Sequence, residues 1–576
     1  MSRARYTIGI DFGTESARAV LVDVADGREL GVEVYVYRNG VIDERLPAPD
    51  GDVVLEPDWA LQDPTDYLDT FRIAVPRLVR ATGVDPADVI GVGIDFTSCT
   101  MLPATADGTP LCLLDEYRRE PHAWVKLWKH HAAQPEADRI NALARERGEP
   151  WLPRYGGKIS SEWFYPKSLQ ILDEAPAIYR AAERLIEAAD WVVWQLTGVE
   201  TRNNCTAGYK AIWSKREGFP PPDFFAALDP RFERVVDEKM SREIAFIGQP
   251  AGLLTEQAAD WTGLRPGTVV AVANVDAHVS VPAATVTEPG TMVLVMGTSI
   301  CHLVLGREAA IVEGMCGVVE DGIVPGLYGF EAGQSAVGDI FAWFVEHGVP
   351  PEYHERARRL GSDVHEVLAE AAGRLRPGES GLLALDWWNG NRSILVDVDL
   401  SGVLLGLTLA TKPPEIYRAL IEGTAFGTRL IVETFEKAGV AVDRLVACGG
   451  LPERNPLLMQ IYADVTGRPL RIAGSSQTPA LGSAMFAAVA AGPERGGYAS
   501  IEEAALRMAR LRDVEYVPTE AHRPVYDELY AEYVRLHDLF GRGGDPAIKT
   551  LRRIRREARG ETRGAATAAA GPAAAS

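Results

Sequence analysis

Apolar runs long enough for a buried strand alternate with segments of helical periodicity along most of the chain. Strand-like runs occupy residues 6–10, 89–96 and 268–275. Residues 65–81, TDYLDTFRIAVPRLVRA, instead space their apolar positions as one face of a helix does. Strands that are buried on both faces and alternate with helices are typical of α/β proteins. The pattern therefore predicts an α/β architecture.

The plan of the N-terminal stretch is repeated about halfway along the chain. An apolar strand, a Gly-Thr turn and a second apolar strand occur in YTIGIDFGTESARAVLVD (6–23) and again in PGTMVLVMGTSICHLVLG (289–306). Two such units predict two domains built on related plans. We expect an N-terminal domain over 1–285, a C-terminal domain over 286–545 and a basic, low-complexity tail over 546–576. We expect the polar, aromatic-rich segment 112–265 to add substrate-facing loops to the first domain.

The composition and net charge indicate which classes of molecule the protein can bind. The net charge of −21 over 576 residues disfavours nucleic acid, because phosphate backbones require clustered Lys and Arg, but it allows a small phosphorylated ligand. The basic tail could be a partner arm, although a solvated helix end with a frayed tail is the favoured interpretation. The sequence has no apolar stretch of 18 or more residues, its first residues MSRARYT lack the apolar segment expected of a signal peptide, and its six cysteines form no CxxC pair. We therefore expect a cytoplasmic protein with reduced thiols and no membrane partner.

A carboxylate, Asp11, ends the first predicted strand. Such a group costs stability unless a metal, a hydrogen-bonded turn or an arginine compensates it. The following Gly13 and Thr14 allow a tight turn whose N–H groups suit an anion, and a carboxylate beside an anion requires a divalent cation such as Mg²⁺. The alternative is that Asp11 only caps a hairpin. The second turn, at Gly297 and Thr298, favours a polyphosphate held from both sides.

A third candidate site lies near the end of the chain. No GxxxxGK[ST] or GxGxxG motif is present, so the nucleotide hypothesis depends on the paired turns and on residues 443–470. There a strand runs into Gly449 and Gly450, and a helix follows with Asn455 as N-cap and Pro456 at its first position. Glycines between a strand and a helix let a flat ligand approach the backbone. They also serve close helix–strand packing, which is the alternative.

Asp276 is the second carboxylate that follows an apolar strand, in NVDAHVS. At the edge of a cleft it could accept the proton of a hydroxyl that attacks a phosphoryl group. Its neighbour His278 is expected to be structural or to support Asp276 rather than to react.

Taken in order, these motifs resemble the FGGY carbohydrate kinases, which have the actin/Hsp70/hexokinase ATPase fold. Over about residues 6 to 490 the matching stretches are DFGTESAR (11–18), GIDFTSCTMLP (93–103), VKLWKHHAAQPEAD (125–138), GYKAIWS (208–214), NVDAHVS (274–280), VMGTSICHL (295–303), GFEAGQSAVGD (329–339), DWWNGNRS (386–393), IEGTAFGTRLIVETF (421–435) and CGGLPERNPLLMQIYADVTGRP (448–469). The resemblance implies an α/β protein with two ribonuclease H-like lobes and an active site in the cleft between them.

The resemblance also assigns roles to individual residues. Asp276 corresponds to the catalytic base and Asp11 to the Mg²⁺-associated carboxylate. The residues expected at the phosphates are Gly13, Thr14, Arg18, Gly297, Thr298 and Ser299. Those expected at the adenosine are Gly449, Gly450, Asn455, Ala480 and Gly482, and those expected at the sugar are Ser98, Trp128, Lys210, Asp276 and Glu331. Glu15 differs from the small hydroxyl residue that is frequent in the family, and its charge should point away from the phosphates.

The expected activity is ATP- and Mg²⁺-dependent phosphorylation of the terminal hydroxyl of a ketopentose, foremost L-ribulose, a step of L-arabinose breakdown. The alternatives are a family kinase for D-ribulose, xylulose or a polyol such as ribitol, a nucleotide-switched chaperone or filament of the same fold, and a sugar sensor without catalysis. The expected partners are the sugar and ATP. The sequence does not set the oligomeric state, for which a homodimer is the working assumption.

Overall fold

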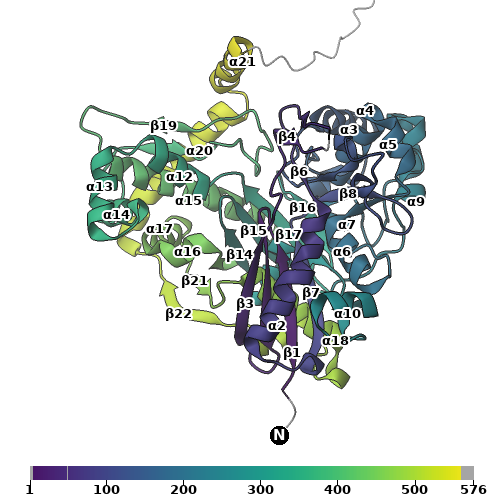
Figure 1. Cartoon of the computed structure of the whole chain (residues 1–576). Coiled ribbons are helices and arrows are strands. Elements are labelled where there is room, and N and C mark those ends of the chain that lie inside the picture. Colours follow the sequence, from purple (N-terminus) through teal and green to yellow (C-terminus); the bar gives the residue numbers. More distant parts are fainter. Residues whose placement is uncertain (1–3, 49, 560–576) are drawn as a thin grey trace, which may run out of the picture.

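A computed structural model of the protein describes residues 4–48 and 50–559. It has two lobes, each built around a β-sheet (Figure 1). The N-terminal sheet has the order β11-β12-β7-β1-β2-β3, and β13 also pairs with β7. These strands are β1 Tyr6–Phe12, β2 Ser16–Asp23, β3 Glu29–Val36, β7 Val89–Phe96, β11 Pro250–Leu253, β12 Val269–Ala271 and β13 Asn274–Val275.

The C-terminal sheet repeats this plan. Its order is β16-β17-β15-β14-β20-β21-β22. The strands are β14 Gly290–Met296, β15 Ile300–Gly306, β16 Gly317–Glu320, β17 Tyr328–Gln334, β20 Val442–Cys448, β21 Leu470–Ala473 and β22 Leu511–Tyr516. In each sheet three antiparallel strands (β3-β2-β1 and β17-β15-β14) continue into two parallel ones (β7 and β12, β20 and β21). The α/β, two-lobed prediction is confirmed.

Most local predictions match elements of the structure. The helix expected over 65–81 comprises α1 Pro64–Asp69, a π-helical segment Thr70–Ala74 and α2 Val75–Thr82. The prediction of a single strand over 268–275 is wrong. The segment is divided into β12 and β13, because the backbone between them turns aside so that Val272 N–H donates to the Gln249 carbonyl.

Helices alternate with loops in the segment 112–265, so the expectation of loops alone is incomplete. The segment contains α3 Gln134–Arg147, α4 Phe164–Glu174, α5 Pro176–Ala181, α6 Ala188–Thr197, α7 Asn204–Lys210, α8 Pro222–Leu228, α9 Val235–Lys239 and α10 Glu256–Thr262. Its aromatic side chains, for example Trp151, Tyr165 and Phe225, are buried against one another and form a core of their own. The polar and aromatic composition thus reflects a packed helical cap rather than an open surface.

Two helices form a large part of the contact between the lobes. α11 Asp276–Ala283 and α18 Thr478–Ala491 pack on each other, and α18 also covers β1 and β7 of the N-terminal sheet. The approach is close: a Cβ atom at Gly9 would lie 1.7 Å from the Ala480 carbonyl oxygen, and one at Gly93 would lie 1.9 Å from that of Ser483. Small residues on both sides are therefore required at this contact.

The C-terminal lobe ends in helices. α15 Pro413–Lys437 and α20 Arg523–Gly541 pack together, and α21 Ala547–Arg559 follows at the top of Figure 1. The predicted tail 546–576 therefore begins as a helix, and its residues 560–576 lie outside the described part of the chain.

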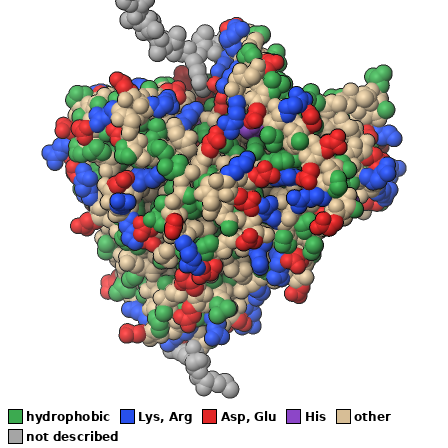
Figure 2. Space-filling model, turned by 180° about the vertical axis from the view of Figure 1, so that it is seen from behind, with side chains coloured by type: hydrophobic (Ala, Val, Ile, Leu, Met, Phe, Trp, Pro, Cys, Tyr) green, Lys and Arg blue, Asp and Glu red, His purple; other side chains and the backbone are tan. Residues whose placement is uncertain are grey.

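Three expectations from composition can be compared with the structure. All six cysteines are free. None of the helices within residues 4–48 and 50–559 has both the length and the apolar character needed to cross a bilayer. On the face shown in Figure 2, basic and acidic side chains are interspersed, so this face offers no continuous basic surface of the kind that nucleic acid requires.

Candidate active site

Three aspartates lie where strands of the N-terminal sheet end. Asp11 on β1 and Asp95 on β7 are register partners on adjacent parallel strands, and Asp276 follows β13 directly as the first residue of α11. Burial, together with the Asp11 charge, raises the pKa of Asp276 to about 7. The same two causes raise the pKa of Asp95 well above its ordinary value. Because the Asp11 charge raises the pKa of both other carboxyls, the structure brings the predicted base and the predicted metal-associated residue into one electrostatic cluster.

The first Gly-Thr turn connects β1 to β2. Gly13 N–H closes it by donating to the Ser16 carbonyl at 3.0 Å, and Arg18 Nη1 lies 3.7 Å from Asp11 Oδ2. Burial raises the pKa of Asp11, although the Arg18 charge opposes the shift. The Glu15 side chain is exposed and faces Gly40.

The second turn connects β14 to β15 in the corresponding position of the other sheet. Gly297 N–H donates to the Ser299 carbonyl at 2.9 Å. The Thr298 carbonyl accepts from Val337 N–H at 2.7 Å, immediately before α12 Gly338–His347. Gly297 and Thr298 are exposed. α11, which begins with Asp276, packs against both β14 and β15, so the helix that carries the predicted base also contacts the strands of this turn.

Two predicted sugar residues form an ion pair between the lobes. Lys210 Nζ, at the end of α7, donates to both carboxylate oxygens of Glu331 on β17 at 3.0 Å, and the two side chains are only 6% and 8% exposed. Burial alone would raise the pKa of Glu331, but Lys210 holds it below its ordinary value. His278 Nε2 lies 3.4 Å from Glu331 and its ring stacks on Tyr209, which gives this histidine a supporting position.

Ser98 and Trp128 are joined to this region through a buried lysine. Lys167 Nζ on α4 donates to the Cys99 and Leu127 carbonyls, both at 2.7 Å, so it holds the segments that present Ser98 and Trp128. Trp128 Nε1 in turn donates to Thr14 Oγ1 at 3.0 Å. This bond connects a predicted sugar residue to a predicted phosphate residue.

The predicted adenosine residues divide into two groups. Asn455 caps α17 Pro456–Thr466 by accepting from Leu458 N–H, after a short helix α16 Gly450–Arg454 that the sequence did not indicate. Gly449 has φ +98°, and a Cβ there would lie 2.4 Å from the Met296 carbonyl oxygen, so glycine is required for packing. Ala480 and Gly482 are buried in α18 between the lobes. A contact of these residues with adenosine stays a prediction.

Sequence reasoning missed Asp95 and Lys167. Asp95 carried the same signal as Asp11, a carboxylate near the end of an apolar strand, and could have been found. Lys167 could not, because a lysine within the helical segment FYPKSLQILDE normally suggests an exposed side chain.

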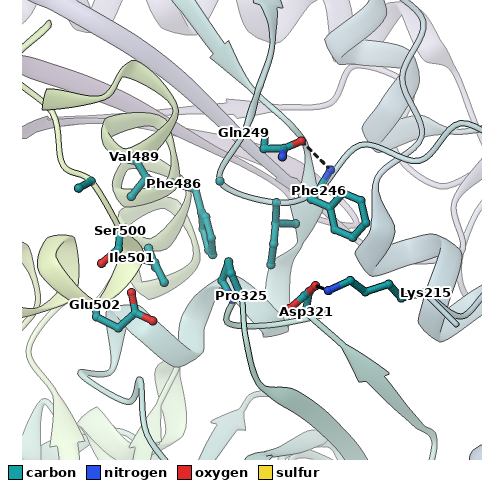
Figure 3. Close-up of a pocket in the computed structure, with 13 residues that line it drawn as sticks. Lys215, Phe246, Gln249, Asp321, Pro325, Phe486, Val489, Ser500, Ile501 and Glu502 are labelled. Atoms are coloured by element: carbon teal, nitrogen blue, oxygen red, sulfur yellow. Dashed lines mark hydrogen bonds and ion pairs between the residues drawn. The ribbon is translucent and has the colours of Figure 1, made fainter. Parts of the chain in front are cut away.

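A cavity of about 420 Å³ lies apart from these residues (Figure 3). It is lined by residues of both lobes, including Phe246, Phe486 and Ile501, and the ion pair between Lys215 Nζ and Asp321 Oδ2, at 2.6 Å, borders it. Its lining includes no predicted site residue, so the candidate active site is defined by the carboxylates and not by this cavity.

Comparison with known proteins identifies the family. The model of the N-terminal domain of the FGGY family of carbohydrate kinases matches residues 6–281, and that of the C-terminal domain matches residues 292–491. The chain belongs to the FGGY family of carbohydrate kinases. It is therefore a phosphotransferase that acts on a carbohydrate, and kinases of this family use ATP.

Full-length relatives lie within the same family. The chain is 59% identical to a ribulokinase from Geobacillus thermodenitrificans over 555 residues, covering 96% of this chain and 98% of that protein. It is 55% identical to a ribulokinase from Mycolicibacterium smegmatis over 564 residues, covering 98% and 99%.

Solved structures agree on the fold of this FGGY kinase. The xylulose kinase from Rhodospirillum rubrum matches with a TM-score of 0.72 at 23% identity, and the coverage is 92% of this chain and 98% of that one. The glycerol kinase from Plasmodium falciparum, solved with ADP, matches with a TM-score of 0.72 at 15% identity, with the same coverage of 92% and 98%. The predicted actin/hexokinase-like ATPase fold is confirmed.

Proposed function

We propose that this FGGY kinase transfers the γ-phosphoryl group of ATP to the terminal hydroxyl of L-ribulose and yields L-ribulose 5-phosphate. The observation that carries the proposal is identity of 55–59% over 94–98% of the chain with ribulokinases from several bacteria. Solved relatives named for other sugars match at 23% identity or less, and they support only the fold.

Asp276 is the proposed general base. A pKa of about 7 keeps a substantial fraction of this carboxyl deprotonated at neutral pH while making it far more basic than an exposed aspartate. It accepts the proton of the sugar hydroxyl as that oxygen attacks phosphorus. Desolvation therefore supplies the basicity that the reaction requires.

The ion pair of Lys210 and Glu331 is the proposed anchor for the sugar. Lys210 offers donors for the keto oxygen or a hydroxyl, and Glu331 accepts from hydroxyls. Trp128 contributes a flat face, and Ser98 a hydroxyl. The pair joins α7 of one lobe to β17 of the other, so sugar binding and the relative position of the lobes are coupled in this proposal.

The carboxylates suit a magnesium ion. Asp11 and Asp95 lie side by side, and their carboxyl groups are close enough to share a hydrogen bond. The described part of the chain holds no cluster of three or more His, Cys, Asp and Glu side chains placed to bind a metal. That fits Mg²⁺, which is usually bound by one or two carboxylates plus substrate phosphates. When bound, Mg²⁺ neutralises phosphate charge, and Asp11 would hold it, assisted by Asp95.

The two Gly-Thr turns are the proposed phosphate contacts. Gly13, Thr14 and Arg18 would contact the nucleotide from the N-terminal lobe, and Gly297, Thr298 and Ser299 from the C-terminal lobe. The equivalent positions of the turns in two sheets of the same plan support this assignment. We propose that the adenosine lies near Gly449, Gly450 and Asn455.

A sugar panel tests the proposal. Purified protein, ATP and Mg²⁺ are incubated with L-ribulose, D-ribulose, D-xylulose or ribitol, and ADP release is followed. We expect the highest kcat/KM with L-ribulose and little ATP hydrolysis without sugar. Preference for another pentulose or polyol would overturn the substrate assignment, and sugar-independent hydrolysis would favour a non-kinase ATPase.

A further inference from the structure

A small closed loop lies in the segment that follows β18 Leu383–Leu385. Asn391 and Asp397 exchange backbone hydrogen bonds of 2.9 and 2.8 Å, and Leu395 N–H donates to Asn391 Oδ1 at 2.9 Å. These bonds fix both ends of residues 391–397, which we call the bridging loop. The loop carries the arginine of the DWWNGNRS motif, Arg392, to which the proposed function gives no role.

The bridging loop is attached to the strand that carries Glu331. Ser393 N–H donates to the Gly333 carbonyl at 3.1 Å, and Gly333 N–H donates to Ser393 Oγ at 3.2 Å. Gly333 is two residues beyond Glu331 on β17, so both residues project from the same face of that strand. A Cβ atom at Gly333 would lie 3.0 Å from Arg392 Cδ. The Arg392 side chain therefore lies next to Glu331 along the strand.

The opposite side of the loop contacts the N-terminal lobe. Lys158 Nζ donates to the Val396 carbonyl at 3.2 Å, and Arg392 Nη2 lies 3.9 Å from Glu162 Oε1. The guanidinium makes no hydrogen bond within residues 4–48 and 50–559, and its side chain is 26% exposed. A guanidinium has five N–H donors, so most of its binding capacity is available at this position.

We propose that Arg392 is a further sugar-contacting residue, placed there by the bridging loop, and that α21 holds the loop in position. The proposal rests on the proposed function, because Glu331 marks the sugar site. Arg392 donates to sugar oxygens on the side of Glu331 that faces the N-terminal lobe. A guanidinium that is not already saturated by protein acceptors can make such bonds without breaking others.

Three cations of α21 contact the end of this segment. Lys549 Nζ pairs with Asp397 at 2.6 Å, and Arg556 Nη2 pairs with Asp399 at 2.5 Å. Arg552 Nη1 donates to the Val398 carbonyl at 2.5 Å and to the Leu400 carbonyl at 3.1 Å. The spacing of three and four residues places all three cations on one face of the helix. A single surface ion pair contributes little, but two ion pairs and an arginine that binds two carbonyls, all on residues 397–400, act as a network.

The same helix provides a matched control. Arg553 and Arg555 are exposed, and Arg553 pairs with Glu557 within α21 rather than with the loop. R552E/R556E and R553E/R555E therefore change the net charge of the same helix equally. Only the first pair places acidic groups against residues 398–400, including Asp399.

Calorimetric binding of the sugar panel and of ATP to the full chain tests the inference without requiring turnover. We expect Arg392→Met to raise the sugar Kd about tenfold or more, with the Kd for ATP within about twofold of the parent value. Arg392→Lys should recover part of the loss. R552E/R556E should raise the sugar Kd about fivefold and R553E/R555E less than about twofold, and R552E/R556E should add nothing further in the Arg392→Met background.

An unchanged sugar Kd in folded Arg392→Met, or no sugar binding by the parent protein, overturns the contact. Equal effects of the two α21 pairs, or full additivity with Arg392→Met, overturn the role of α21. Thermal unfolding of each variant verifies that it is folded. If the parent binds a pentulose but does not phosphorylate L-ribulose, the substrate proposal fails while this inference is still decided by the binding data.

Discussion

Asp11, Asp95 and Asp276 have the same type of side chain, but their surroundings give them different chemistry. Arg18 forms an ion pair with Asp11, whereas Asp95 is fully buried and accepts a hydrogen bond from Ser483 Oγ at 2.6 Å. The pKa of Asp276 is raised by burial and by the Asp11 charge to about 7. Sequence could mark Asp11 and Asp276 because each ends an apolar run. Only the packed environment distinguishes a base from a carboxylate paired with an arginine or a carboxyl that burial keeps protonated.

The raised pKa of Asp276 predicts an acid limb in the rate profile. Protonation removes the base, so kcat/KM for the sugar should fall about tenfold per pH unit below about 7. Asp276→Asn should lose roughly 10²–10⁴-fold in kcat, as expected for removal of a general base, while the sugar Kd changes little. Steady-state rates over pH 5–9 and calorimetry measure both. Activity of the variant within tenfold of the parent would remove Asp276 from the mechanism.

The same shift has a consequence for stability with a definite sign. The folded state binds the Asp276 proton more tightly than the unfolded state does, so this residue stabilises the protein at low pH. That contribution is lost as the pH rises from about 4, the unfolded value, through about 7. Asp276→Asn should therefore have a higher Tm than the parent protein at pH 8 and a smaller advantage at pH 5. A Tm difference that grows towards low pH would contradict the assignment.

At the scale of elements, local sequence signals described the hairpins and β20–α17 well. Gly13 and Gly297 mark turns between apolar strands, and Asn455-Pro456 marks a helix start, because each effect acts over a few residues. The packing of α18 on β1 and β7 had no such signal. Its small residues are also what a glycine- and alanine-rich surface helix would show, and the partner strands lie far away in sequence.

This helix–sheet contact predicts an asymmetric tolerance of glycine replacement. Gly9→Ala would place a Cβ 1.7 Å from the Ala480 carbonyl oxygen, so backbone must move and stability should fall by about 1–3 kcal/mol or more. Gly450→Ala has no atom within 4 Å of its new Cβ, so its free energy of unfolding should lie within about 0.5 kcal/mol of the parent value. Urea unfolding of both variants measures the difference. Equal stabilities would mean that α18 does not pack as described.

At the scale of the whole molecule, the two lobes meet through buried polar groups as well as through helices. Lys210 and Glu331 come from different lobes and are buried together, and Asp95 of one lobe accepts from Ser483 of α18. The sequence named Lys210 and Glu331 only through family resemblance. Nothing local shows that residues this far apart along the chain form an ion pair.

The pair predicts strong coupling between its members. Lys210→Met leaves the buried Glu331 charge without its partner, and Glu331→Gln leaves the buried Lys210 charge without its partner. Removal of one member of a buried ion pair typically lowers the free energy of unfolding by about 3–5 kcal/mol. The double variant should be more stable than the sum of the single effects predicts, with a coupling energy above about 1 kcal/mol in urea unfolding. Additive single effects would indicate that the two side chains do not interact in solution.

The cover that α18 provides for β1 has a consequence for synthesis of the protein. The ribosome makes Gly9 near the beginning of translation and Ala480 only in the last fifth of it. Until then one apolar face of the first sheet has no partner, although its strands are already complete. The nascent N-terminal half therefore exposes this apolar face to other chains while elongation continues, and such exposed surface is prone to aggregation.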